Sequence, residues 1–262
     1  MSENILEINN LSKYFGGLAA VSDCSLNVKR GTITGIIGPN GSGKTTLFNL
    51  IAGNLKSSSG MVTFDKENIT DVPSYELFSK GLLRTFQIAH EFSNLSVLEN
   101  LMMVPGNQSG EKLMTALLKP KLVSEEEAIV KEKAKEVVDF LNLTHLSNEL
   151  AGNLSGGQKK LLELGRTMMV DAKLVLLDEV GAGVNRTLLK DLGTAIEKLN
   201  KEKGYTFCMI EHDMDFIGRL CDPVIVMAEG SVLFEGSVDE VKKDEKVIES
   251  YLGRGSKLKD SN

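Results

Sequence analysis

The chain has 262 residues, of which 42% are apolar and 25% are charged, and its formal net charge is -6. This composition supports one buried core, with room for two lobes, and excludes the basic surface that nucleic-acid binding needs. The start, MSENILEINN, lacks the features of a secretory signal, and no apolar run reaches the roughly 18 residues of a membrane span. We therefore expect a cytosolic chain with no nucleic acid as partner.

The three cysteines are widely spaced and form no CxxC pair. Neither a disulfide framework nor a zinc site is indicated, so we expect Cys24, Cys208 and Cys221 to remain reduced thiols. Residues 254–262 form a polar tail, which we expect to be disordered.

A β-branched, apolar run at 32–37 leads into a glycine-rich turn and a helical pattern at 45–52. Residues 38–45 read GPNGSGKT and match GxxxxGK[ST] in the strand, loop and helix context of a phosphate-binding loop. We expect ATP and Mg²⁺ to bind here, with Lys44 on the phosphates and Thr45 on the metal. The predicted phosphate-binding residues are Gly38, Pro39, Asn40, Gly41, Ser42, Gly43, Lys44, Thr45 and Thr46.

Between residues 95 and 166 strand signals disappear and helical periods replace them. Ser124 precedes three glutamates and predicts a helix start with a capping box. One face of this helix is apolar, which we interpret as packing on the protein's own core rather than as a partner groove. The residues of this face are Val130, Ala134, Val137, Val138 and Leu141.

Two short apolar runs, at 174–177 and 206–210, are typical of strands buried on both faces of a parallel sheet. Asp178 and Glu179 follow the first run, and His212 follows the second. Because open α/β sheets bind ligands at the carboxyl ends of their strands, we expect these three side chains to meet at one site.

The runs at 224–227 and 231–235 predict an antiparallel hairpin that closes the fold. The predicted fold class is α/β, a P-loop NTPase core with a mixed, mainly parallel sheet, antiparallel strands at the edge and an inserted helical subdomain. We place the core at residues 1–94 and 167–253 and the helical subdomain at 95–166.

The run LVLLDE is typical of a Walker B segment. Its first acid, Asp178, can bind Mg²⁺, and its second, Glu179, can polarise an attacking water. Acids at a strand end often serve only solvation, so this interpretation depends on the phosphate loop upstream.

Residues 154–158 read LSGGQ, in which two glycines after Ser155 open a helix and form a second anion-binding N-terminus. The segment resembles the signature sequence of ABC ATPases, which a monomeric P-loop phosphotransferase would lack. In the family resembled, the signature of one subunit completes the nucleotide site of the other, so that two ATP molecules lie between two subunits. The residues implied to act on the partner's ATP are Ser155, Gly156, Gly157 and Gln158.

The same resemblance implies roles for three further positions. Phe15, with Tyr14 as the alternative, resembles the aromatic residue that stacks on adenine. Gln87 resembles the Q-loop glutamine that contacts Mg²⁺ or the attacking water, and His212 resembles the switch histidine on the γ-phosphate. The implied catalytic residues are therefore Glu179, His212 and Gln87, and the implied metal ligands are Thr45, Gln87 and Asp178.

Residues 180–185, VGAGVN, depart from the family pattern. The family usually has proline after the catalytic glutamate and an aspartate later in the D-loop. Asn185 keeps hydrogen-bonding capacity without charge, and Val180 leaves the backbone less restricted than proline would. We predict that hydrolysis survives these changes.

Softer motifs resemble the ATP-binding proteins of branched-chain amino acid importers over about residues 5–253. They are YFGGLAAV, RTFQ, SVLENLMM, IEHDM and the terminal YLG. The resemblance implies import of branched-chain or other hydrophobic amino acids, with the chain peripheral on the cytoplasmic face of the membrane. Implied partners are two integral membrane permease subunits, a second ATP-binding subunit, identical or related, and an external solute-binding protein. Urea or amide uptake, lipid export and a soluble non-transport ATPase remain alternatives.

Overall fold

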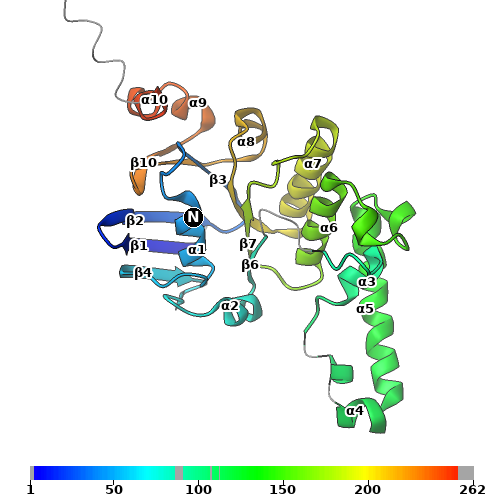
Figure 1. Cartoon of the computed structure of the whole chain (residues 1–262). Coiled ribbons are helices and arrows are strands. Elements are labelled where there is room, and N and C mark those ends of the chain that lie inside the picture. The colour runs from blue at the N-terminus through cyan, green and yellow to red at the C-terminus, as the bar shows by residue number, and fades with distance from the viewer. Residues whose placement is uncertain (1–2, 86–90, 107, 112, 253–262) are drawn as a thin grey trace, which may run out of the picture. The chain divides into compact units, whose positions relative to one another are not determined.

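The computed structural model describes residues 3–85, 91–106, 108–111 and 113–252. The chain divides into two compact units (Figure 1). The α/β unit comprises Met1–Arg84, Lys173–Gly181 and Glu197–Asn262, and the helical unit comprises Thr85–Ala172 and Ala182–Ile196. The domain boundaries predicted from the sequence, with the helical subdomain at 95–166, remain a prediction.

The larger sheet of the α/β unit has six strands in the order β10-β9-β3-β8-β7-β6. All neighbours are parallel except β9 and β10, which form the predicted antiparallel hairpin. Every residue of β3, β7 and β8 is buried, as their continuous apolar runs predict. The strands are β3 (Ile33–Ile37), β6 (Leu82–Arg84), β7 (Leu174–Asp178), β8 (Thr206–Ile210), β9 (Val224–Ala228) and β10 (Ser231–Gly236).

The smaller sheet of the α/β unit is antiparallel, in the order β2-β1-β4-β5. Its strands are β1 (Asn4–Phe15), β2 (Leu18–Lys29), β4 (Ser59–Phe64) and β5 (Glu67–Asn68). The helix α1 (Lys44–Ile51) contributes Leu47 and Phe48 to a core cluster that also contains residues of both sheets. This arrangement confirms the predicted fold class.

The other helices of the α/β unit are short. They are α2 (Ser74–Lys80), α8 (Met214–Leu220), α9 (Val238–Val241) and α10 (Glu245–Leu252), while α7 (Arg186–Lys203) begins in the helical unit and ends in the α/β unit. No helix among the described residues has the length and apolar character needed to cross a membrane.

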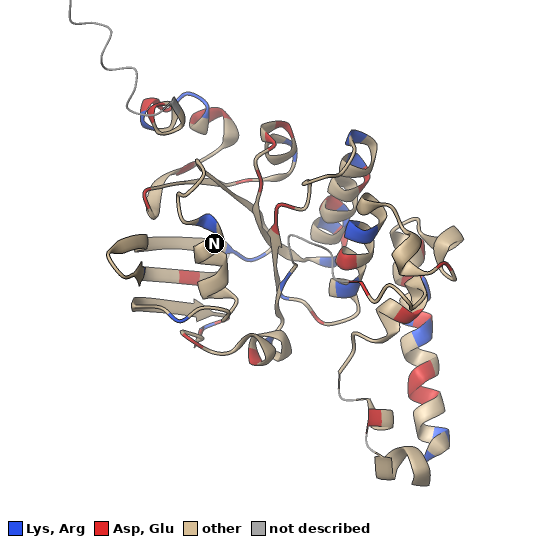
Figure 2. Cartoon of the chain, in the orientation of Figure 1, with Lys and Arg blue, Asp and Glu red and all other residues tan. Residues whose placement is uncertain are grey.

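The helical unit contains no strand in its described residues between 91 and 172. Its helices are α3 (Val97–Met102), α4 (Leu113–Leu118), α5 (Pro120–Phe140) and α6 (Gly156–Met168), with 3₁₀ turns at Ser109–Glu111, Thr144–Leu146 and Ala151–Asn153. The predicted apolar face of α5 packs inward, since Ala134, Val137 and Val138 are buried. The rest of α5 carries both acidic and basic residues (Figure 2).

The predicted start of this helix at Ser124 is wrong. The helix begins at Pro120, whose fixed φ and missing N–H suit the first helical turn, so Ser124 lies inside the helix. Glu126, part of the apparent capping box, instead accepts hydrogen bonds from the backbone N–H and the hydroxyl of Ser109, at 2.8 and 2.7 Å.

Candidate functional site

The predicted phosphate loop connects β3 to α1, and Lys44 is the first residue of that helix. Its side chain is nearly buried, and Nζ donates hydrogen bonds to the carbonyl oxygens of Gly38 at 2.8 Å and Pro39 at 3.0 Å. Burial lowers the pKa of Lys44, while the nearby carboxylates of Glu179 and Asp178 act in the opposite direction. The ammonium group of Lys44 therefore lies close enough to Asp178 and Glu179 for their charges to influence it, and phosphate oxygens can bind it.

Glycine is required where the loop turns into the helix. Gly43, which precedes α1, has φ of 98°, and a Cβ atom there would lie 2.4 Å from the carbonyl oxygen of Ala20. No side chain among the described residues caps this end of the helix, which leaves its first N–H groups to bind an anion. Thr45 is exposed at the same end.

Glu179 and His212 meet as predicted. The Nε2 atom of His212 lies 2.9 Å from Oε1 of Glu179, and both side chains are partly exposed. The backbone N–H of Glu179 donates to the carbonyl oxygen of Ile210, the last residue of β8. Glu179 also has φ of 49°, a left-handed conformation that is strained for a non-glycine residue and is common at functional sites. This geometry gives water access to a carboxylate that a histidine orients.

Asp178, the other predicted acid, is nearly buried and forms an ion pair with Arg84. The Nη2 atom of Arg84 donates a hydrogen bond to Oδ2 of Asp178 at 2.7 Å, and its Nη1 atom donates one to Oδ1 of Asn49 in α1 at 2.6 Å. Arg84 was not among the predicted site residues, although it begins the RTFQ motif that contains Gln87. Gln87 itself lies outside the described residues.

Glu211, directly before His212 in the IEHDM motif, is a second residue of this site that was not predicted from the sequence. It is buried, and it accepts hydrogen bonds from the backbone N–H groups of Gly181 at 2.6 Å and His212 at 3.2 Å. Burial raises its pKa, against the lowering effect of these two hydrogen bonds. Glu211 thus ties the backbone after Glu179 to the backbone of the predicted switch histidine.

The side chains at the carboxyl end of β7 and at the start of α1 fit a magnesium ion. Asp178 and Thr45 offer a carboxylate and a hydroxyl oxygen, the donor type that Mg²⁺ prefers. In the described part of the chain no group of three or more His, Cys, Asp or Glu residues is placed to hold a metal. Mg²⁺ bound together with nucleotide phosphates and water needs only one or two protein carboxylates, so the donor set agrees with a metal that enters with ATP.

Phe15 ends β1 with 48% of its side chain exposed, and the Nζ atom of Lys13 lies 5.1 Å from its ring centroid. It is therefore not a core residue; Lys13 lies over one face of its ring, so adenine would stack on the other face or displace the lysine. Tyr14 is exposed to a similar degree, at 47%, so exposure does not choose between the two.

In the helical unit, α6 begins at Gly156, as the LSGGQ segment predicts. Ser155 and Gln158 form a capping box, in which the N–H of Ser155 donates to Oε1 of Gln158 at 2.9 Å. Ser155 and Gly156 are exposed, whereas Gly157 is buried against Leu188 of α7. A Cβ atom on Gly157 would lie 2.4 Å from Cδ1 of Leu188, so this glycine is needed for helix packing as well as for any anion contact.

Asn185, the predicted D-loop residue, caps α7. Its Oδ1 atom accepts a hydrogen bond from the N–H of Leu188 at 2.9 Å, and its carbonyl oxygen accepts one from Leu189. Val180 is buried, with 5% of its surface exposed. In the predicted D-loop, Asn185 therefore caps a helix, and Val180 packs as a buried apolar side chain.

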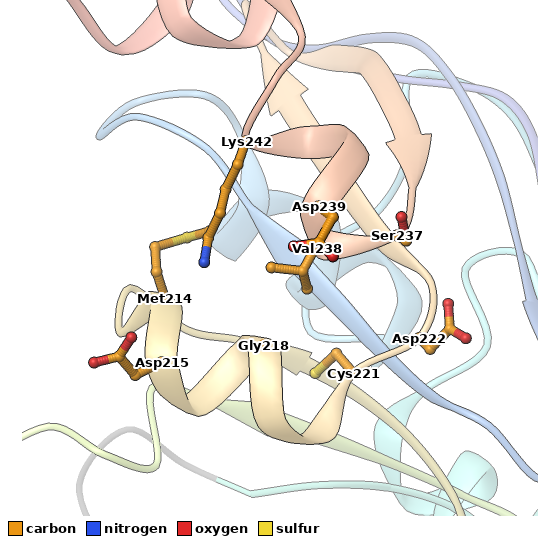
Figure 3. A pocket seen from close by; sticks show the side chains of 9 residues that line it. All are labelled: Met214, Asp215, Gly218, Cys221, Asp222, Ser237, Val238, Asp239 and Lys242. Carbon is orange, nitrogen blue, oxygen red and sulfur yellow. The ribbon is translucent and has the colours of Figure 1, made fainter.

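A separate cavity of about 420 Å³ lies between α8 and the segment Ser237–Lys242. Figure 3 shows Lys242 extending toward Met214, with Cys221 facing the cavity. Cys221 and Asp222 lie just before β9, at the edge of the sheet opposite the carboxyl ends of its parallel strands. None of the predicted nucleotide-binding residues lines this cavity.

Comparison with known proteins agrees with these observations. The family described as ABC transporter matches residues 21–182, and the family described as branched-chain amino acid ATP-binding cassette transporter matches residues 231–257. A probable branched-chain amino acid transport ATP-binding protein LivG from Archaeoglobus fulgidus is 43% identical, with 95% of each chain covered. The high-affinity branched-chain amino acid transport ATP-binding protein BraF from Pseudomonas aeruginosa is 35% identical, over 97% of this chain and 99% of its own.

Two solved structures of similar chains support the same assignment. A nucleotide-free ATP-binding cassette from an ABC transporter has a TM-score of 0.82 at 40% identity, and a cassette in its ADP conformation has 0.82 at 39%; each covers 96% of this chain and 100% of its own. The family match at residues 21–182 covers the phosphate loop, Asp178 and Glu179, and the helix α6 described above. The chain belongs to the ABC transporter family, as one of its ATP-binding cassettes.

Proposed function

We propose that this protein is the ATP-hydrolysing subunit that energises import of branched-chain or other hydrophobic amino acids. The observation that carries the proposal is the second family match, at residues 231–257, because it lies outside the general ATPase match and belongs to the branched-chain branch. The full-length similarity to LivG and BraF proteins supports it further.

In the proposed reaction, the phosphate loop binds the nucleotide and Lys44 balances charge on its phosphates. Glu179 accepts a proton from the attacking water, and His212, 2.9 Å from it, orients the carboxylate and donates a hydrogen bond toward the γ-phosphate. Mg²⁺, when bound, would neutralise phosphate charge, with Asp178 and Thr45 as its protein ligands and Gln87 as the third predicted one. An exposed aromatic, Phe15 or Tyr14, provides the stacking surface for adenine.

The exposed start of α6 supports a two-subunit reaction. Ser155 and Gly156 present a hydroxyl and backbone N–H groups at a helix N-terminus, where a second subunit's ATP can bind. We propose that the partner ATPase is identical or related, that two permease subunits hold the pair at the cytoplasmic face of the membrane, and that an external solute-binding protein delivers the solute.

Transport measurements test this function directly. Cells that lack the protein, complemented with the native chain or with the Glu179→Gln variant, are compared for uptake of leucine and of urea. Leucine uptake restored by the native chain alone, together with co-purified integral membrane proteins, supports the proposal. Urea uptake without leucine uptake contradicts the amino-acid assignment, and the absence of co-purified membrane proteins would indicate a soluble ATPase instead.

A further inference from the structure

Arg84 forms a nearly buried ion pair with Asp178 in the predicted nucleotide site. The side chains of Arg84 and Asp178 are 11% and 4% exposed, and Nη2 of Arg84 lies 2.7 Å from Oδ2 of Asp178. The Nη1 atom of the same guanidinium lies 2.6 Å from Oδ1 of Asn49. A guanidinium held at both ends in this way cannot swing freely, because its two donating groups have fixed partners.

The bridge connects the two elements that carry Thr45 and Asp178, two of the three protein ligands predicted for Mg²⁺. Asn49 lies in α1, four residues after Thr45, and Asp178 ends β7. No hydrogen bond from the described residues reaches Oδ1, the other carboxylate oxygen of Asp178. One oxygen of Asp178 is therefore held by Arg84, and the other is left for a further ligand.

Stability alone is a poor explanation for this arrangement. A buried ion pair often contributes little net stability because of the cost of removing both charges from water. The Nε atom of Arg84 is also buried without a hydrogen-bond partner among the described residues, which adds to that cost. An arginine kept under these conditions is better explained by the orientation that it imposes on a carboxylate.

We propose that Arg84 is a positioning residue for the metal-binding carboxylate: it holds Oδ2 of Asp178 and thereby presents Oδ1 to the magnesium of Mg·ATP. Asn49 anchors the guanidinium in this role. The inference rests on the proposed function of the nucleotide site, and it assigns to Arg84 no direct contact with the nucleotide.

The test measures metal binding apart from hydrolysis. Mn²⁺ replaces Mg²⁺, and electron paramagnetic resonance measures its affinity for the full-length protein saturated with ADP. Because loss of a residue that orients a metal ligand typically costs about 10- to 100-fold in metal affinity, Arg84→Gln should weaken Mn²⁺ binding by that factor. Arg84→Lys should weaken Mn²⁺ binding less, since lysine keeps the positive charge but cannot bond Asp178 and Asn49 at once through a planar guanidinium.

Two matched variants and one binding assay separate positioning from general damage. Arg30→Gln removes an arginine from the exposed ion pair with Asp65 and should leave Mn²⁺ affinity unchanged. Asn49→Ala keeps the Arg84–Asp178 pair but removes its anchor, so a smaller loss of affinity is expected even where Arg84→Gln fails to fold. ADP affinity with EDTA present should be the same in all variants, because Lys44 and the phosphate loop are unchanged.

The outcomes are distinct. Unchanged Mn²⁺ affinity in Arg84→Gln and Asn49→Ala, with only a lower melting temperature, would overturn the inference and leave Arg84 a structural residue. Tighter Mn²⁺ binding would also overturn it, since Arg84 would then compete with the metal. A native protein that binds ADP and Mn²⁺ normally but supports no amino-acid uptake would contradict the proposed function and leave the role of Arg84 standing.

Discussion

Two helices of this chain have glycine at their start, α1 directly after Gly43 and α6 at Gly156, and each offers an N-terminus to an anion, yet their surroundings differ. At the start of α1, Lys44 is buried and Asp178 and Glu179 are close enough to influence its pKa. At the start of α6, Ser155 is exposed, and its capping partner is Gln158 of the same turn. Both helix starts therefore carry the partial positive charge of a helix N-terminus. The start of α1 also has Lys44, Asp178 and Glu179 close to it, whereas the start of α6 is capped by the neutral side chains of Ser155 and Gln158.

The difference supports the proposal that the reaction site forms at the start of α1 and that the start of α6 complements the site of a second subunit. A helix N-terminus contributes partial positive charge and N–H donors, but hydrolysis also needs a base and a metal ligand. In the proposed reaction these groups are Glu179 and Asp178 of the α/β unit, at the carboxyl end of the buried strand β7. Predictions that alter one helix start, or the groups beside it, test this division of roles.

The largest effect is expected for Glu179→Gln. The amide keeps the size and the hydrogen bond toward His212 but cannot accept a proton, so the hydrolysis rate should fall by about 10²- to 10⁴-fold. ATP binding should persist, because Lys44 and the loop are intact, and the ATP-bound protein should elute as a dimer in size-exclusion chromatography. A variant that stays monomeric with saturating ATP would contradict the two-subunit site.

A comparable loss of hydrolysis, without loss of nucleotide binding, is expected for Ser155→Arg. The long side chain would block the exposed helix start that the partner's ATP is expected to use. Equilibrium binding of ATP to the isolated subunit should be unchanged, since Ser155 lies in the helical unit and the phosphate loop lies in the α/β unit. Hydrolysis that continues at the native rate would show that α6 has no role in the reaction.

The core of the site could be predicted from the sequence because each motif is local. The phosphate loop is a short glycine-rich segment between a strand and a helix, and Glu179 and His212 each follow a strand whose apolar run is visible in the sequence. Adjacent parallel strands then bring these residues together without further information.

Arg84 and Glu211 could not be predicted in the same way. Arg84 pairs with Asp178, 94 positions away, and Glu211 bonds to the backbone of Gly181, 30 positions away. Neither partner follows from spacing or composition, because the contacts exist only in the folded sheet. The start of α5 was mispredicted for a different reason: two local signals competed, and proline at the first helical position prevailed over the serine and glutamates at 124–127.

Gly157 and Gly156 provide a matched pair for the packing role of the signature helix. In Gly157→Ala, the new methyl group would overlap Leu188, and we expect the free energy of unfolding to fall by about 1–3 kcal/mol. In Gly156→Ala, the nearest atom to the new Cβ is 3.9 Å away, so alanine should be neutral or stabilise the protein by up to about 1 kcal/mol. Urea denaturation measures both, and equal effects would contradict the packing explanation.

The smallest effect is expected on the pH dependence of stability, through the buried side chain of Glu211. Burial raises its pKa in the folded protein, so the folded state retains a proton at pH values where the unfolded state, with a glutamate pKa of about 4.3, has lost it. The free energy of unfolding therefore decreases as pH rises from that value through the raised pKa, and then levels off.

Glu211→Gln should remove this part of the pH dependence while Oε1 continues to accept the hydrogen bond from Gly181. Melting temperatures between pH 4 and pH 8 should then vary less in the variant than in the native protein, and ATP affinity should be the same in both. An identical pH profile would show that the pKa of Glu211 does not differ between the folded and the unfolded state. Since the helical unit does not contain Glu211, such a result would leave the contrast between the two helix starts intact and would change only the account of how the backbone after Glu179 is held.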